Sequence, residues 1–578
     1  MSEQGQGARS GAEFSAIERD RQLLVDARGK GKLSMFGAFV KLSGPGWLQS
    51  AITLGGGSLS GALFLGVLGG MAFMWLQPLA MILGIIMLSA IGYVTLSTGE
   101  KPFRAINQHV NPVLGWGWII ATMLANLVWC LPQYSLGTAA VRQNLLPGLL
   151  GEGSGLSDTQ ANLIVVLAIT VLCVAIVIFY DKGRKGVRVL EWVLKGMVGI
   201  IVVSFIGVVV VMSMSEKGLD WSGIWAGFVP DLSLLSKPAS TFNAALEAVG
   251  PVGSKFHDFW SNMIVTQQRD VMVGAAAVAV GINMTFLLPY SMLKKGWDRN
   301  FRGLAIFDLS TGLFIPFILV TGCVVIAASA QFHNKPAEGV LDGTAPPAVM
   351  AKYEKVAGSR VKEEVGKDAF DKLSKDEVKV AIAALPEADR QMAAKLVKRD
   401  AFSLAQALAP LTGKGVANYV FGIGVVGMAV SSIMVLMLIN GFVVCEIVGV
   451  EFRGLAYRIG AIIPALVGMW GPFIWSGKTQ FWLAVPTSVF GFVLMPIAYF
   501  TFFLIMNQKS LLGADRPRGF KRIWWNVAMF VAASLAGLGS LWVVWNKAHA
   551  WGLAAFAAFV VLAVVVQIVR KKPHAQAR

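Results

Sequence analysis

Long apolar stretches separated by short polar loops make up most of this chain. A helix needs about 20 consecutive, mostly apolar residues to cross a bilayer, and twelve stretches meet that requirement. The pattern predicts an all-α polytopic membrane protein. The twelve stretches lie near residues 37–69, 71–97, 114–146, 161–180, 187–213, 272–293, 303–331, 415–447, 458–476, 481–506, 523–546 and 550–570.

The first stretch is interrupted by three consecutive glycines, Gly55, Gly56 and Gly57, which Ser58 follows. Each glycine costs a helix about 1 kcal/mol relative to alanine, so the run predicts a break. Lipid cannot hydrogen-bond the freed backbone, so the break must face protein or a wet cavity. The first half-helix would expose carbonyls near Leu54, and the second would expose N–H groups, with Ser58 as its cap. Close helix packing is the alternative role for these glycines.

The sixth stretch carries polar residues and a helix breaker at mid-depth, namely Gly281, Asn283, Thr285 and Pro289. A simple proline kink is the alternative, but it does not explain the Asn and Thr upstream. Two broken spans, five apart, predict an inverted five-plus-five helix repeat of the leucine-transporter type, with discontinuous helices 1 and 6 facing each other. Secondary transporters bind their substrates at such breaks.

The distribution of charge indicates how the chain is oriented in the membrane. The chain is 55% hydrophobic and only 14% charged, yet its net charge is +17. The basic residues gather in loops that the span count places on one side, which favours cytoplasmic termini and needs no nucleic acid as partner. We expect an integral protein of a bacterial inner (cytoplasmic) membrane, surrounded by lipid.

Two polar segments interrupt the series of spans. Ser215 to Val271 resembles a surface-lying loop, and residues 331–413 contain a capping box at Ser374 to Glu377 that opens a helix. The second segment would act as a lid or a partner surface, or be an inert insertion. The predicted layout is a mobile cytoplasmic tail at 1–36, transmembrane helices 1–7 at 37–330, an extracytoplasmic helical insertion at 331–413, transmembrane helices 8–12 at 414–571 and a second tail at 572–578.

Polar residues within the spans are the candidates for a site. Eight around the two breaks are candidates for binding substrate: Thr53, Gly55, Gly56, Gly57, Ser58, Asn283, Met284 and Thr285. Five others could line a pathway, although interhelical hydrogen bonding is the alternative for each: Asn126, Gln133, Ser431, Ser432 and Asn440. The four cysteines and five histidines show no metal or redox spacing. The residues therefore assign no metal-ligand set, and we expect no cofactor.

Several strings resemble one transporter family. Gly44-Pro-Gly-Trp precedes the first break, Ser431-Ser432 opens a stretch that ends at Glu446, and Arg458-Ile-Gly-Ala-Ile-Ile-Pro464 enters the ninth span. In this order they resemble the Nramp (natural resistance-associated macrophage protein) family of proton-coupled divalent-metal transporters. The resemblance covers roughly Lys41 to Ile505 and leaves out the insertion.

The metal-binding motif of that family is not kept. Its Asp-Pro-Gly-Asn falls on Gly55 to Ser58, its methionine on Thr285, one position from Met284, and its proton-linked histidine on Leu287. The resemblance therefore implies a divergent relative of the family. Without a carboxylate, a bare divalent ion would be poorly compensated. A cation that keeps water, such as Mg²⁺, suits the remaining oxygens better.

The leading hypothesis is a secondary transporter that moves a metal cation by alternating access, and the resemblance also implies coupling to a proton or another ion. A carrier of a small organic acid or amino acid, bound at the N–H groups of Gly55 to Ser58, is the first alternative. A sensor or scaffold without transport is the second. An enzyme is not expected, because the spans contain no nucleophile–base pair or phosphate loop. The sequence assigns no oligomeric state.

Overall fold

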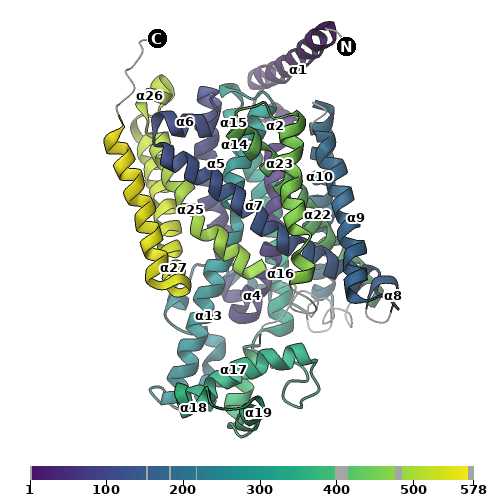
Figure 1. The fold of residues 1–578 in the computed structure, drawn as a ribbon, viewed down its shortest axis with the longest axis vertical. Coiled ribbons are helices and arrows are strands. Elements are labelled where there is room, and N and C mark those ends of the chain that lie inside the picture. The colour runs from purple at the N-terminus through teal and green to yellow at the C-terminus, as the bar shows by residue number, and fades with distance from the viewer. Residues whose placement is uncertain are drawn as a thin grey trace.

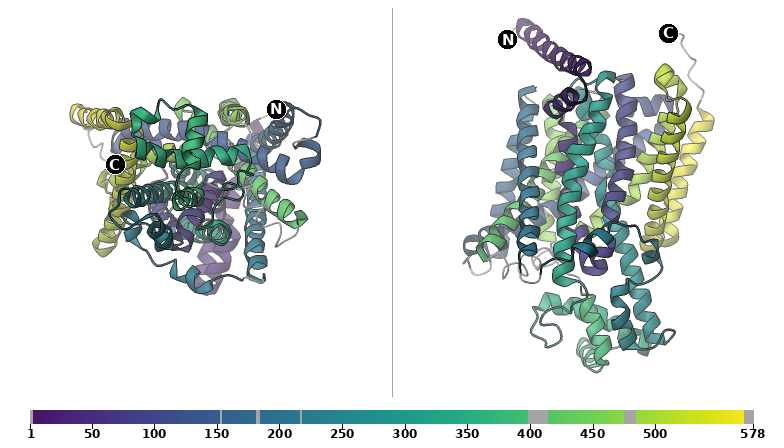
Figure 2. Two further views of the ribbon diagram at one scale, coloured as in Figure 1. Left: turned by 90° about the horizontal axis from the view of Figure 1, so that it is seen from below. Right: turned by 180° about the vertical axis from the view of Figure 1, so that it is seen from behind.

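The computed structural model describes residues 3–151, 154–180, 184–215, 218–397, 414–474 and 484–570. Within these ranges the chain forms helices and no strand. Helices that run nearly parallel form one bundle, and a smaller group of helices lies beyond one of its faces (Figure 1). We call this the insertion face, because it carries α17–α20. The opposite face, which carries α1 and the last turn of α27, is the terminal face (Figures 1 and 2).

The first half of the chain supplies these helices: α1 (Glu3–Lys30), α2 (Lys32–Leu42), α3 (Pro45–Thr53), α4 (Gly56–Gly69), α5 (Leu76–Thr98), α6 (Pro102–His109), α7 (Pro112–Ala140), α8 (Pro147–Leu150), α9 (Asp158–Tyr180), α10 (Arg184–Ser213), α11 (Trp221–Ala226), α12 (Asn243–Val249), α13 (Lys255–Ala279), α14 (Ile282–Lys294), α15 (Arg302–Asp308) and α16 (Ile315–Phe332). The second half supplies α17 (Pro347–Val365), α18 (Lys367–Phe370), α19 (Lys375–Ala383), α20 (Glu387–Lys395), α22 (Lys414–Val448), α23 (Gly454–Gly468), α24 (Gly471–Ile474), α25 (Ala484–Met506), α26 (Lys509–Leu512) and α27 (Gly519–Val569).

Ten of the described helical stretches are long and apolar enough to cross a membrane, and a further pair bent by 60° after Met506 passes the same test together. The 51-residue α27 leaves helical geometry at His549 (φ 48°). Its two arms lie side by side (Figure 1). With the bent pair counted as one span and the arms of α27 as two, the described residues contain the twelve spans that the sequence predicts.

The spans that the sequence predicts to be broken are broken. α3 and α4 are separated by Leu54 and Gly55, and α13 and α14 by Val280 and Gly281. Pro289 lies inside α14 and does not mark the second break. α3 and α14 pack against each other, as do α4 and α13. Both halves of one broken helix therefore pack against the corresponding halves of the other.

Helix α13 is longer than the sequence indicates. It begins at Lys255, so residues 255–271 are helical and continue directly into span six, whereas we expected a surface-lying loop up to Val271. The first turns of α13 reach past the bundle to α17 and α18 (Figure 1). They contact the insertion there, which is why polar residues could extend an otherwise apolar span.

The amino-terminal segment, expected to be a mobile tail, is described as helix from Glu3 onward. Arg21 pairs with Asp298 at 2.7 Å, and Leu24 and Ala27 are buried. α1 therefore packs on the loop that follows α14, and α2 leads from it into the first half of the broken span one.

Candidate functional site

The first break joins two half-helices through a side chain. Gly55 has an extended backbone (φ −116°, ψ −173°) and precedes α4, with no side-chain cap. Ser58, which we expected to cap α4, lies within the first turn of that helix. Its hydroxyl donates instead to the carbonyl of Thr53, the last residue of α3. The hydroxyl thus satisfies a carbonyl at the end of α3 that the break leaves without a helical partner.

Glycine at the first break also permits close packing. A Cβ atom at Gly55 would lie 2.5 Å from the Ser432 hydroxyl, and one at Gly56 would lie 2.9 Å from a methyl group of Leu136. Real side chains cannot approach so closely without movement of one partner. The glycine run therefore serves both roles considered from the sequence: it interrupts the helix, and it lets α7 and α22 approach the interruption.

The second break is held by a tryptophan from span three. A Cβ atom at Gly281 would lie 2.4 Å from the ring of Trp129. Downstream, the Thr285 hydroxyl donates to Ile282 O at 2.5 Å and accepts from Trp118 Nε1 at 2.9 Å. Thr285 is thus engaged with its own helix and with α7.

The two breaks meet through Met284. Gln49 Nε2 donates to the Met284 carbonyl at 3.1 Å, and the Thr53 hydroxyl donates to Met284 Sδ, also at 3.1 Å. Asn283, beside it, is fully buried, and its Oδ1 accepts from the Met284 N–H at 2.9 Å. Met284, rather than Thr285, is therefore the residue of α14 that faces the end of α3.

Span eight and span three support the first break with side-chain oxygens. Ser431 Oγ and Ser432 Oγ donate to Ala51 O at 3.0 and 3.3 Å. Ser432 also reaches Ile52 O at 3.3 Å. On the other side of the break, Gln133 Oε1 accepts from the Gly56 N–H at 2.9 Å. Three of the five pathway candidates thus contact the break directly.

The other two pathway candidates differ in their surroundings. Asn440 Nδ2 donates to Gly460 O at 2.7 Å, so it joins α22 to α23. Asn126 is fully buried, and neither polar atom of its side chain has a partner among the described residues. It lies two turns before Gln133 on α7, and residues seven apart share one face of a helix.

A small cavity opens beside the first break. Its volume, taken as the space open to the centre of a water molecule, is about 20 Å³, enough for one or two waters. Four predicted substrate residues and Gln133 line it. The described residues that line it are Ile52, Thr53, Gly55, Gly57, Ser58, Trp129, Pro132, Gln133, Val278 and Thr487.

The remaining predicted substrate residues, Gly56, Asn283, Met284 and Thr285, are buried and do not line the cavity. Sequence reasoning missed Trp129 and Pro132, which share α7 with Gln133, and Thr487 of α25, whose carbonyl accepts from Trp129 Nε1 at 2.6 Å. A one-turn spacing from Gln133 could have indicated Trp129. Nothing local indicates Thr487.

Of the described residues that line the cavity, none is charged. Charged groups gather instead at the end of α3 nearer the terminal face. Asp308 Oδ2 accepts from the N–H groups of Gly44 and Gly46 at 3.1 and 2.7 Å, and Lys195 Nζ donates to Ser43 O at 2.8 Å. These contacts explain the Gly-Pro-Gly string: a Cβ at Gly46 would overlap the Asp308 carbonyl.

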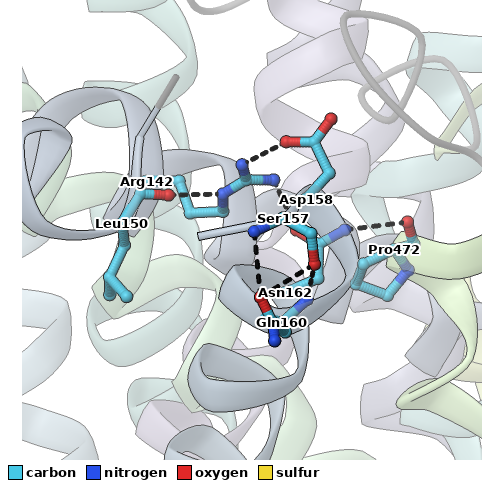
Figure 3. A network of polar contacts seen from close by, with 7 residues as sticks. All are labelled: Arg142, Leu150, Ser157, Asp158, Gln160, Asn162 and Pro472. Carbon is cyan, nitrogen blue, oxygen red and sulfur yellow. Dashed lines mark hydrogen bonds and ion pairs between the residues drawn. The ribbon is translucent and has the colours of Figure 1, made fainter. Parts of the chain in front are cut away.

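Towards the insertion face, a separate network fixes the end of span three (Figure 3). Arg142 donates to Leu150 O and Asn162 Oδ1, both at 2.7 Å, and pairs with Asp158 at 2.5 Å. Asn162 reaches Pro472 O at 3.4 Å. The network ties the ends of spans three, four and nine together, and it uses all its charged groups internally.

Comparison with known proteins assigns the family. The family described as natural resistance-associated macrophage protein-like (Nramp) matches residues 46–351 and 380–546. The chain belongs to the Nramp family. Among curated proteins, none matches the sequence. Membership makes the chain an integral membrane protein and a secondary transporter of metal ions, as the sequence predicts.

Solved structures agree on the Nramp fold. A point mutant of the Eremococcus coleocola manganese transporter superposes with a TM-score of 0.59 at 12% identity, covering 92% of this chain and 94% of that one. The same transporter, in complex with an aromatic bis-isothiourea substituted compound, gives 0.60 at 13% identity, covering 93% and 95%. The predicted leucine-transporter-type helix repeat is thereby confirmed.

Proposed function

We propose that this protein moves a divalent metal cation, with part of its water shell retained, through the gap between its two broken helices. One observation carries the proposal: in a chain of the Nramp family, the Thr53 hydroxyl and the Met284 thioether meet at 3.1 Å beside a cavity lined by the ends of the half-helices. The similar solved structures are of a manganese transporter, which supports a divalent ion.

We expect the cation to keep part of its water shell, because the described lining of the cavity is neutral. Carbonyl and hydroxyl oxygens near Thr53 and Ser58 can orient a cation, but no carboxylate offsets its charge. An ion stripped of water at such a site would lose several kcal/mol of solvation without return. Mg²⁺ keeps most of its waters in protein sites, so the oxygens of the site can also take Mg²⁺, whereas the Met284 sulfur favours Mn²⁺. The cavity holds only one or two waters, so passage requires the half-helices to separate.

The breaks supply the hinges for that separation. α3 and α14 lie towards the terminal face, and α4 and α13 towards the insertion face. Each pair meets at two non-helical residues, where large backbone changes can be absorbed. The contacts of Asp308 and Lys195 hold α3 closed at the terminal face. Opening of that face would require these contacts to break.

Orientation and coupling complete the proposal. The terminal face is cytoplasmic, because the basic loops gather on that side. The membrane is, in this proposal, a bacterial inner membrane. Residues 331–413 form an extracytoplasmic insertion. Transport is coupled to a proton or another ion, the protein acts with membrane lipid around it, and no catalysed reaction is involved.

A carrier of an organic or amino acid would use the N–H groups of Gly56 to Ser58. One of them is already occupied, because the Gly56 N–H donates to Gln133. This contact leaves fewer donors for an organic or amino acid, and membership of the Nramp family favours the cation as the leading substrate. A sensor without transport would show no uptake of either class of solute.

Uptake of Mn²⁺ and Mg²⁺ into proteoliposomes containing the full chain tests the proposal. Thr53→Val keeps the shape but removes the hydroxyl, and we expect it to lower metal uptake about tenfold, equivalent to roughly 1.4 kcal/mol. Thr321→Val is the matched control, since Thr321 is equally buried but bonds only to its own helix, at Phe317 O. Absence of uptake and of thermal stabilisation by either metal, together with stabilisation by an amino acid, would contradict it.

A further inference from the structure

The cavity has two chemically different walls. One wall is the end of α3, where carbonyl oxygens and the Thr53 hydroxyl are acceptors. The other is the start of α4, a helix of 14 residues that begins at Gly56. The first N–H groups of a helix have no helical partner, and the positive end of its dipole lies there. This second wall favours negative charge.

Gln133 adds a donor to this second wall. The Gly56 N–H can only donate, so the amide atom that faces it, 2.9 Å away, must be Oε1. The Nε2 group then occupies the other end of the amide. Gln133 is only 6% exposed and lines the cavity, and its Nε2 has no partner among the described residues. A flipped amide would place two donors face to face.

The backbone of Gly57 supplies another donor. Gly57 lines the cavity, and within residues 51–60 it alone is partly exposed. No partner is described for the N–H groups of Gly57 and Ser58, whereas the Leu59 N–H already bonds to Gly55 O. The α4 wall therefore offers an amide side chain and first-turn N–H groups to one small space.

We propose that the α4 wall binds a small monovalent anion, a halide or a compact carboxylate, which travels with the metal cation. The inference rests on the proposed function, because the anion replaces the carboxylate that the chain lacks at residues 55–58. The cation would lie against the α3 wall, and the anion would accept from Gln133 Nε2 and the Gly57 N–H. Donors on the α4 wall would repel a lone cation, so an anion bound there would make the site more favourable for the metal than it is without one.

Thermal melting of the detergent-solubilised full chain, without divalent metal, tests the anion site by itself. We expect sodium chloride and sodium formate to raise the melting temperature relative to sodium gluconate, whose anion is too large for the cavity. Gln133→Glu should abolish this difference. One carboxylate oxygen can still accept from the Gly56 N–H, while the other replaces the Nε2 donor and repels anions.

Metal uptake tests whether the anion travels with the metal cation. With chloride replaced by gluconate on both sides, we expect wild-type Mn²⁺ uptake to fall about tenfold, while uptake by Gln133→Glu becomes independent of the anion, because the carboxylate is now built in. Gln160→Glu is the matched control. Gln160 also accepts hydrogen bonds through Oε1, from Ser157, but it lies exposed at the start of α9 (Figure 3). Its anion dependence should match the wild type.

The outcomes separate the two proposals. Equal Mn²⁺ uptake and equal melting of the wild type in chloride, formate and gluconate overturn the anion site and leave metal transport standing. Melting that responds to chloride only when Gln133 is intact, without Mn²⁺ or Mg²⁺ uptake in any salt, supports the anion site and overturns metal transport. If Gln133→Glu does not fold, the comparison of chloride, formate and gluconate in the wild type still tests the anion site.

Discussion

The Thr53 hydroxyl donates to the Met284 sulfur across the gap between the two interrupted spans, at 3.1 Å. The contact joins the last residue of α3 to the first turn of α14. A thioether is a soft ligand, and it favours transition metals over Mg²⁺. The pairing therefore places a soft donor where a cation would pass between the half-helices.

Met284→Leu should lower the preference for Mn²⁺ over Mg²⁺ several-fold, because it removes the soft sulfur at nearly constant volume. Competition between the two ions for uptake measures the ratio. Met292→Leu is the control, since Met292 is equally buried on the same helix. An unchanged ratio in Met284→Leu would show that the sulfur does not touch the ion.

Gly55→Ala should destabilise the protein by about 1–3 kcal/mol, because the added Cβ would lie 2.5 Å from Ser432 Oγ. Ser432→Ala removes that oxygen. We therefore expect the double variant to lose less stability than the two single variants lose together, as measured by thermal melting. Strict additivity would mean that the clash is relieved elsewhere.

Asp389→Ala should loosen the insertion. Arg360 is 1% exposed, and its Nε lies 3.0 Å from Asp389 Oδ1, to which Trp260 Nε1 also donates at 2.6 Å. Removal of the Asp389 carboxylate leaves Glu364, whose side chain is 52% exposed, as the ion-pair partner of the buried Arg360 at 2.7 Å, and leaves Trp260 Nε1 without this acceptor, so we expect a cost of about 1–3 kcal/mol. Limited proteolysis should then cut residues 347–395 much faster. Lys379→Ala, which removes an exposed pair at 4.0 Å, should have no measurable effect.

Mild acid should weaken the junction between span seven and the insertion. His333 lies just past α16 and contacts Val67 O at 3.0 Å and Thr241 Oγ1 at 2.8 Å. Burial lowers the pKa of His333; its bond to Val67 O opposes this effect, and the charge of Lys335 adds to it. The folded state thus binds this proton less readily than the unfolded state.

The contribution of His333 is therefore complete above the unfolded pKa of about 6.5 and declines as the pH falls through and below that value. Melting temperature measured from pH 8 to pH 5 should show the decline. His333→Gln should flatten this part of the curve, and an unchanged slope would place the titrating group elsewhere.

Both breaks could be predicted from the sequence because their causes are local. Three glycines destabilise a helix wherever they occur, and Gly281 with Asn283 marks the second break. The role of Ser58 could not be predicted, because a hydroxyl in the first turn of a helix can cap its own helix or bond across the break. Packing of α7 and α22 against the glycines fixes where α4 begins, and no sequence pattern near Ser58 records that packing.

The start of α13 and the wall at Thr487 depend on contacts distant in sequence. Polar residues 255–271 become helical because Trp260 packs against the insertion, which brings Asp389 from far along the chain. Thr487 enters the cavity lining because Trp129 donates to its carbonyl. Periodicity describes one helix at a time, so neither contact could be inferred from it.

Helix α13 runs without interruption from Trp260, locked in the insertion, to Val278 at the cavity wall. At 1.5 Å per residue this rod is about 27 Å long, so a 10° tilt at the break displaces the Trp260 end by roughly 5 Å. A small change of angle at the break therefore produces a large displacement of the insertion. An antibody bound both to the insertion and to the end of a helix that does not move would prevent α13 from tilting. A fluorophore on the insertion would report each transport cycle from outside the bilayer.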